Sequence, residues 1–304
     1  MYKYTNGDFG ALIVTVFFIV SGFVLYLNNK EVTNIKTFYY KRFKSIFPMF
    51  YLVWLIFYIK NVITVRYPFY AGNPLKFLLT VIGQDGYFSQ RIIDYYTVGE
   101  WFLGALIFVY LLYPLLSNSL NKKPILTLII LTFLYEIITR LNLPVISPGF
   151  PSITESCLKV YIGMMFAKKF GSLYDKKLMI VSLIYFVIYT AIPVQIKLVQ
   201  NELNIINGMA LFIVLLNLGK ILTNTEFMKK ILNNMGKLTY PIFLFQHQMI
   251  LVILNIYNPS SVFGSMLALL ICVVIIIICS IVADYLIKKL FKTEIYQKFE
   301  KKFI

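Results

Sequence analysis

The 304-residue sequence has few of the groups that common enzyme sites require: 14% of its residues are charged, and it contains three cysteines and one histidine. The cysteines (Cys157, Cys272 and Cys279) lie in apolar segments without a CxxC or Cys/His spacing, which predicts free thiols and no zinc site. The GxSxG, Walker, HExxH and Gly-rich dinucleotide motifs are absent. We therefore expect neither a bound metal nor a bound cofactor.

Apolar residues dominate instead, at 59% of the chain, which excludes an ordinary soluble domain. Segments of roughly 20 apolar residues are long enough to cross the hydrocarbon core of a bilayer as helices. The sequence predicts an all-α polytopic membrane bundle that forms one domain over residues 1–304. About nine transmembrane helices are expected, at residues 9–27, 46–65, 98–117, 124–139, 153–167, 178–196, 205–222, 238–257 and 262–287.

The stretch 11–48 sets the orientation of the predicted helices. Its apolar part carries no charge, and five basic residues follow before the next apolar segment: Lys30, Lys36, Lys41, Arg42 and Lys44. Short cytoplasmic loops collect Lys and Arg, and most of the 29 basic residues fall on the same predicted side. This bias predicts an outside N-terminus, a cytoplasmic C-terminus and a multi-pass protein of the inner or plasma membrane. It also explains the net charge of +16 through topology and anionic lipids, without a nucleic-acid partner.

An outside N-terminus without an evident signal peptide is unusual. The simplest explanation is a further span upstream of Met1, so we expect the chain to be truncated at its N-terminus. On the predicted outer side, residues 66–97 form the longest loop, in which Tyr and Phe recur. These aromatic residues suit a membrane-interface belt and also suit stacking against sugar rings.

Polar residues within a bilayer are costly and are therefore candidate site residues. Gln246, His247 and Gln248 lie within the predicted span 238–257, and His247 is the only histidine. Its imidazole could act as a general base near neutral pH. The alternative is a packed histidine that is hydrogen-bonded to a neighbouring helix.

Two further groups of residues could bind substrates. Glu100 and Trp101 could position a sugar through carboxylate hydrogen bonds and indole stacking, or they could be a helix-start residue and an interfacial anchor. The basic run of Lys41, Arg42 and Lys44 could bind the phosphates of a cytoplasmic donor. Any cytoplasmic loop is basic, however, so topology alone also accounts for this run.

Three oppositely charged pairs are spaced four residues apart, which places both partners on one helix face: Glu136/Arg140, Glu155/Lys159 and Asp284/Lys288. Local salt bridges near the membrane boundaries are the favoured interpretation.

Several stretches together resemble the acyltransferase-3 family of integral membrane proteins. VFFIVSGFVLY (16–26) followed by FYYKRFKSIFPMF (38–50) is similar to the family's FFxxSGF and KRxxRIxP signature. EWFLGALIFVYLLYP (100–114) is similar to its WFL helix, and GKLTYPIFLFQHQMI (236–250) resembles its late GxxSYxxYLxH segment. Their order and spacing also fit the family, over nearly the whole chain.

The resemblance implies a fold of about ten helices and the transfer of acetyl or succinyl groups from acyl-coenzyme A to hydroxyls, commonly of envelope polysaccharides. By position, Lys41 and Arg42 match the basic pair associated with donor binding, and His247 matches the late histidine. Glu100 and Trp101 match the start of the WFL helix. The family's first helix, with an Arg and a His that is considered central to catalysis, has no counterpart in this sequence.

Two functions follow as hypotheses. The favoured one is a membrane O-acyltransferase that moves an acyl group from acyl-coenzyme A to a hydroxyl of a polysaccharide or glycolipid, with a base on the missing first helix and His247 as an assisting catalytic residue. Lys41, Arg42 and Lys44 would bind the donor, and Glu100 and Trp101 the acceptor. If the first helix is truly absent, little activity is expected. The alternative is a transporter or flippase for a polysaccharide or lipid-linked sugar, for which internal symmetry would be typical and is not evident.

Overall fold

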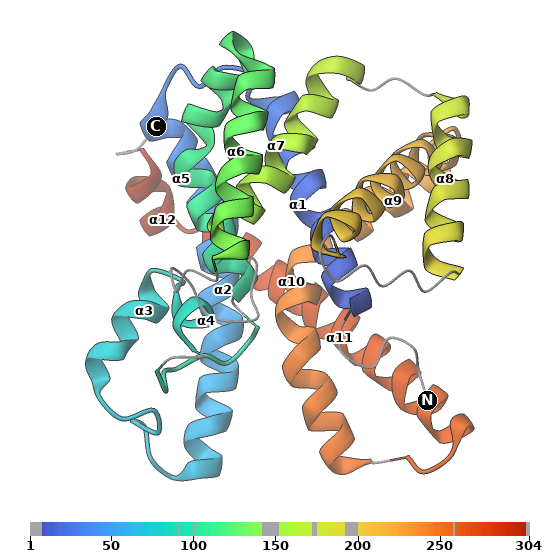
Figure 1. Ribbon diagram of the computed structural model, residues 1–304. Coiled ribbons are helices and arrows are strands. Elements are labelled where there is room, and N and C mark those ends of the chain that lie inside the picture. The colour runs from blue at the N-terminus through green and yellow to red at the C-terminus, as the bar shows by residue number, and fades with distance from the viewer. Residues whose placement is uncertain are drawn as a thin grey trace. The chain divides into compact units, whose positions relative to one another are not determined.

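The computed structural model describes residues 8–89, 92–99, 101–141, 152–171, 175–191, 200–257 and 259–301, which contain helices and no strand (Figure 1). The helices are α1 (Asp8–Asn28), α2 (Ile35–Val65), η1 (Pro74–Lys76), α3 (Phe77–Val81), α4 (Asp85–Phe88), α5 (Trp101–Lys122), α6 (Pro124–Arg140), α7 (Ile153–Phe170), α8 (Lys176–Ala191), α9 (Gln200–Leu222), α10 (Glu226–Ile256), α11 (Val262–Phe291) and α12 (Glu294–Glu300).

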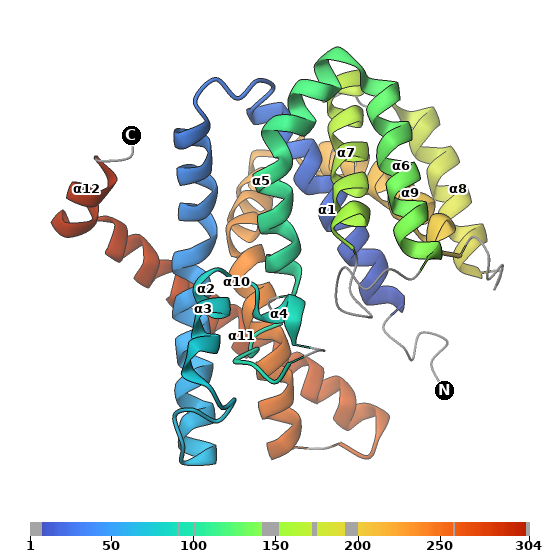
Figure 2. The ribbon, with the colours of Figure 1, turned by 60° about the vertical axis from the view of Figure 1, so that its left-hand side comes forward.

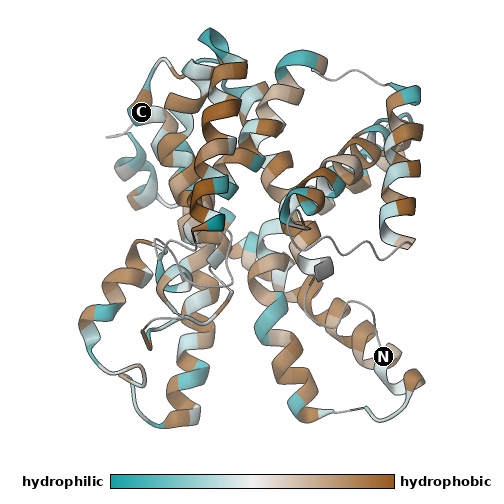
Figure 3. Ribbon diagram, in the orientation of Figure 1, coloured by the Kyte–Doolittle hydropathy of each residue, from teal (hydrophilic) through white to brown (hydrophobic). Residues whose placement is uncertain are grey.

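Six of the described helices are long and apolar enough to cross a membrane: α1, α2, α5, α9, α10 and α11. Figure 3 shows the apolar character of α11, which contrasts with the mostly hydrophilic α12. The predicted all-α polytopic class is confirmed. Of the other predicted spans, α6 has 17 described residues and α8 has 16, while α7 carries charged residues at both ends.

Two helices begin more than ten residues before the predicted spans. Helix α2 begins at Ile35, so four of the five basic residues that we placed in a loop are helical, all but Lys30. The side chain of Asn34 caps this helix by accepting a hydrogen bond from the Thr37 amide at 3.0 Å. Helix α10 begins at Glu226 and continues through Pro241. The expectation was wrong here because hydropathy locates the apolar run, whereas the cap locates the start of the helix.

The contacts divide the chain into two compact units. Unit 1 contains the described residues of 1–32, 112–143 and 151–232, and unit 2 contains those of 33–111 and 233–304. In unit 1, α1 packs against α7 and α9, α6 packs against α7, and α8 packs against α9. Figure 2 shows α1 and α7 side by side and running in the same direction. Gly22 and Gly163 allow this approach, because a Cβ at either position would overlap backbone atoms of the other helix.

Unit 2 is built on α2, against which α11 packs. Tyr51, Trp54 and Tyr58 share one face of α2, since they are three and four residues apart. Each donates a hydrogen bond to a backbone carbonyl in the segment 66–97: Tyr51 to Val81, Trp54 to Tyr95 and Tyr58 to Pro68.

The aromatic residues of the segment 66–97 pack on one another. The rings of Phe77 and Tyr95 stack with centroids 3.9 Å apart and an 8° angle between their planes. Tyr70 contacts Tyr95 edge-on, and Tyr95 is completely buried. These rings form a small folded core. Packing within this segment therefore accounts for some of the aromatic residues that the sequence left open between a membrane-interface belt and stacking against sugar rings.

Candidate functional site

The three basic residues predicted to bind a donor lie in the first turns of α2, in three different environments. Lys41 is exposed. Arg42 is half-buried, with its guanidinium carbon 5.6 Å from the centroid of the Phe38 ring and its side chain within hydrogen-bonding reach of the Tyr110 hydroxyl. Its Nε atom is buried and has no hydrogen-bond partner among the described residues. Arg42 therefore keeps unused donor capacity.

Lys44 is already engaged by the C-terminal end of the described chain. Its ammonium forms an ion pair with Glu300 of α12 at 2.5 Å. The same ammonium lies over the rings of Phe291, at 4.8 Å, and Tyr296, at 5.2 Å, as in cation–π contacts. An added phosphate would have to displace Glu300 to reach Lys44. Local spacing in the sequence gave no sign of this contact, because α12 is distant in the sequence.

His247 is an exposed residue of α10, and it lies beside the segment that leads into α5. A Cβ at Gly99 would be 4.0 Å from the Cβ of His247. The neighbouring Gln248 fixes this arrangement: its amide donates a hydrogen bond to the Thr97 carbonyl, and its Oε1 accepts one from Lys60 at 3.3 Å. His247 is thus held near residues 97–99, and its neighbour Gln248 contacts Lys60 in the later part of α2. The predicted place of His247 in the middle of a span stays a prediction.

Of the predicted acceptor residues, Glu100 lies outside the described residues. Trp101 is the first residue of α5 and is half-buried, with its ring 6.2 Å from that of Phe102 in an edge contact. In the sequence Gly99 directly precedes Glu100 and Trp101, and its φ of +83° is a backbone conformation that favours glycine. The turn at Gly99 therefore brings the start of α5 close to His247.

The structure separates the predicted donor residues from His247. A rise of 1.5 Å per residue puts Lys41 and Lys60 about 28 Å apart along α2, close to the thickness of the hydrocarbon core. The basic residues lie at one end of this helix, and His247 lies at the level of Lys60. Such a spacing suits a reaction whose two substrates approach from opposite sides of a membrane.

Two buried carboxyl groups in the segment 66–97 were missed by the sequence interpretation. Asp85 is fully buried, and neither of its oxygens has a hydrogen-bond partner in the described part of the chain. Burial raises its pKa to about 7; the Thr80 hydroxyl lowers it, and the nearby Asp94 charge raises it. One signal was available: no basic residue lies within four positions of Asp85.

Asp94 is the second of these carboxyl groups. Burial raises its pKa to about 6, although the Tyr96 amide, which donates to Oδ1 at 3.1 Å, and the Lys76 charge both lower it. The three cysteines are free thiols, as predicted. Within the described ranges, no three His, Cys, Asp or Glu side chains come together as metal ligands.

The long apolar helices define a polytopic membrane protein, with polar groups gathered towards the two ends of α2. The chain belongs to the acyltransferase-3 family, since the family's acyltransferase domain matches residues 2–285. It is therefore a membrane acyltransferase, and the resemblance seen in its motifs is confirmed. Searches of curated proteins and of solved structures found no match to the chain.

Proposed function

We propose that this acyltransferase moves an acetyl or succinyl group from acyl-coenzyme A to a hydroxyl of a cell-envelope polysaccharide, exopolysaccharide or glycolipid. The observation that carries the proposal is the arrangement along α2, with an exposed Lys41 and a half-buried Arg42 at one end and His247 beside Gly99 near the other. The protein would lie in a bacterial-type inner membrane with the Lys41 end facing the cytoplasm, where coenzyme A is available.

The donor would be held through its phosphates. Lys41 offers a free ammonium, and Arg42 offers a planar guanidinium with unused donor capacity. Lys44 would join them when Glu300 releases it. Acyl-coenzyme A is a substrate in this scheme, and no resident cofactor is required.

The transfer would occur near residues 97–101, where an acceptor from the outer side meets His247. A base takes the proton of the acceptor hydroxyl, and the oxygen attacks the acyl carbonyl carbon. The new C–O ester bond forms, the C–S thioester bond breaks, and the thiolate takes up a proton and leaves as free coenzyme A. His247 is the candidate base, with Glu100 and Trp101 as the groups that orient the acceptor.

An assay with the full-length protein in lipid nanodiscs tests this function. Radiolabelled acetyl- or succinyl-coenzyme A is incubated with envelope glycan from the source cells, previously treated with mild base to remove existing esters. We expect base-labile label on the glycan, and His247→Asn should reduce kcat about 100-fold or more. Lys41→Gln and Arg42→Gln should raise the KM for the donor, whereas the exposed control Lys292→Gln should leave it unchanged.

Glu300→Gln gives a further check on donor binding. By releasing Lys44 it should lower the donor KM by up to about fivefold, in keeping with an ion pair whose side chains are about a quarter exposed. Absence of label from the glycan with both donors would overturn the proposed function. Movement of glycan across proteoliposomes without acyl-coenzyme A would favour a transporter instead.

A further inference from the structure

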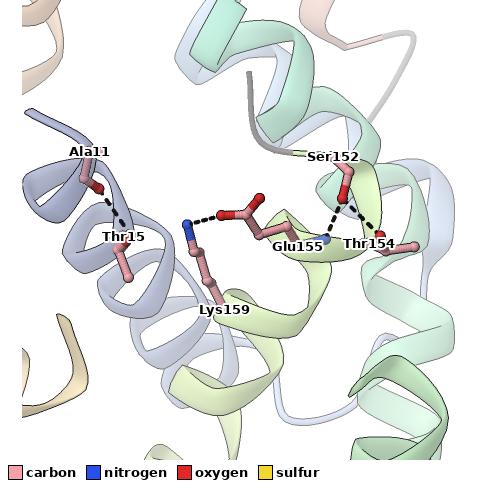
Figure 4. Close-up of polar contacts among 6 residues, drawn as sticks. All are labelled: Ala11, Thr15, Ser152, Thr154, Glu155 and Lys159. Atoms are coloured by element: carbon pink, nitrogen blue, oxygen red, sulfur yellow. Dashed lines mark hydrogen bonds and ion pairs between the residues drawn. The ribbon is translucent and has the colours of Figure 1, made fainter. Parts of the chain in front are cut away.

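Five charged side chains gather in unit 1 at the end of α6 and the beginnings of α7 and α9. Arg140 pairs with Glu136 at 2.7 Å, and Lys159 pairs with Glu155 at 2.5 Å (Figure 4). Figure 4 shows Lys159 extending towards α1, near Thr15, with Glu155 turned back to meet it. These are two of the three pairs that the spacing of four residues predicted, and the third, Asp284 with Lys288, also forms, at 2.5 Å.

Glu202 connects its own helix, α9, to α6. Local spacing in the sequence did not predict this contact. Arg140 Nη2 lies 4.0 Å from Glu202 Oε1, and the carboxyl groups of Glu136 and Glu202 are within hydrogen-bonding reach of each other. The group, which we call the α6–α7–α9 cluster, therefore contains three carboxyl groups and two cations. It holds more carboxyl groups than cations, and a hydrogen bond between the carboxyl groups of Glu136 and Glu202 requires that one of them carries a proton.

Buried polar atoms without partners lie in or beside this cluster. Tyr135 is only 1% exposed, and its hydroxyl lies within electrostatic range of Glu155, Glu202 and Glu136. Thr139 is near the same hydroxyl, but Tyr135 Oη has no partner with hydrogen-bond geometry among the described residues. Ser156, next to Glu155, is 0% exposed and its Oγ is likewise unpaired. Buried polar atoms are normally paired, so these point to a missing partner.

The cluster is open on one side and closed on the other. The side chain of Arg140 is 50% exposed, whereas that of Lys159 is 4% exposed. A solute could therefore reach Arg140 first and Tyr135 only after entering the cluster. Both cations are already paired with carboxylates, which leaves no excess positive charge for phosphates and hence for coenzyme A, while the buried polar atoms disfavour an apolar chain. Hydroxyl groups match the cluster, because each both donates to carboxylates and accepts from cations and from tyrosine.

We propose that the α6–α7–α9 cluster binds hydroxyl groups of the carbohydrate acceptor, in addition to the contacts proposed for Glu100 and Trp101. This inference rests on the proposed function for the identity of the reaction. The side of the membrane agrees with it: in the predicted topology α6 ends, and α7 and α9 begin, on the outer side, where envelope glycan is found. Tyr135 Oη would gain its missing partner from the glycan.

Binding of glycan without any donor tests the inference directly. The full chain in nanodiscs is titrated with fluorescently labelled, mild-base-treated envelope glycan from the source cells, and anisotropy reports binding. We expect Tyr135→Phe to weaken binding about two- to tenfold and Glu202→Gln about tenfold or more, as for one neutral and one charged hydrogen bond. Exposed residues serve as matched controls, and Tyr285→Phe and Glu226→Gln should bind like the wild type.

Tyr135→Phe separates binding from a structural role. Because its hydroxyl has no partner, a purely structural residue would tolerate this change without loss of thermal stability. In the acyl-transfer assay we expect a higher acceptor KM at unchanged donor KM and unchanged melting temperature. Wild-type binding by both cluster variants, or no glycan binding by the wild type, would overturn the inference. Loss of glycan binding in the variants, with no acyl transfer by any form, would sustain the inference and overturn the proposed function.

Discussion

Single carboxyl groups are the residues whose environment differs most from what their sequence neighbours suggest. Asp85 follows a turn and would be expected to face water, but it is fully buried with both oxygens unpaired in the described part of the chain. Ionising such a group costs desolvation energy without a cation to offset it. The folded chain therefore favours a protonated Asp85.

Stability should consequently depend on pH through Asp85. Folding raises its pKa from 3.8 to about 7, so the folded chain binds this proton more tightly than the unfolded chain. The protonated Asp85 contributes its full share of the free energy of unfolding below the unfolded pKa of 3.8. This contribution falls as the pH rises towards the folded pKa of about 7, and it is lost above that pH. Asp85→Asn cannot ionise, and its free energy of unfolding should rise relative to that of the wild type by up to about 2.7 kcal/mol between about pH 5 and pH 8, because about two pH units separate pH 5 from the folded pKa.

Thermal unfolding in detergent micelles at the two pH values measures this difference. Asp94→Asn is the graded comparison and should gain less, because the pKa of Asp94 is raised only to about 6. A gain for Asp85→Asn that is equal at both pH values would contradict the assignment.

Helices approach one another where small residues permit it. The crossing of α1 and α7 depends on Gly22 and Gly163, since a Cβ on Gly163 would overlap the Ile19 carbonyl oxygen. In lipid, close backbone packing replaces much of the hydrophobic driving force that operates in water. The close packing of α7 against α1, and with it the position of Lys159, therefore requires a residue without a Cβ at position 163.

Glycine-to-alanine changes at two helical positions should act in opposite directions. Gly163→Ala forces the two backbones apart and should destabilise the protein by about 1–3 kcal/mol. Gly219→Ala, in α9, meets no atom within 4 Å and should stabilise by about 0.5–1 kcal/mol, because alanine is the better helix former. Melting temperatures of the two variants decide the matter, and a Gly163→Ala variant as stable as the wild type would argue against the close crossing.

Over the whole molecule, the sequence predicted what depends on local composition. Apolar runs predicted the helices, with an end at Leu222 for α9 and a start at Val262 for α11 as observed. It did not predict the contact of Lys44 with Glu300 or that of Arg140 with Glu202, because both join residues far apart in the chain. Of the predicted site residues, His247 and the start of α5 are brought together, whereas Lys41 lies at the far end of α2.

The orientation in the membrane remains a prediction of the basic residues. In a chain whose three native cysteines are replaced by serine, a new cysteine at Leu75, which is exposed in the segment 66–97, should react with a membrane-impermeant maleimide in intact cells. One at the exposed Glu226 should react only after permeabilisation. The reverse pattern would put Lys41 on the outside, out of reach of cytoplasmic coenzyme A.

Helix α2 has 31 residues, which gives it a length of about 46 Å against a hydrocarbon core of about 30 Å. Its excess length must extend beyond the acyl chains unless the helix tilts steeply, and in the proposed orientation this excess includes Lys41 and Arg42, at the level of the lipid phosphates. The headgroups of that leaflet would then compete with the proposed donor for the same ammonium and guanidinium groups. The lipid mixture itself would act as an inhibitor, whose strength grows with its negative charge.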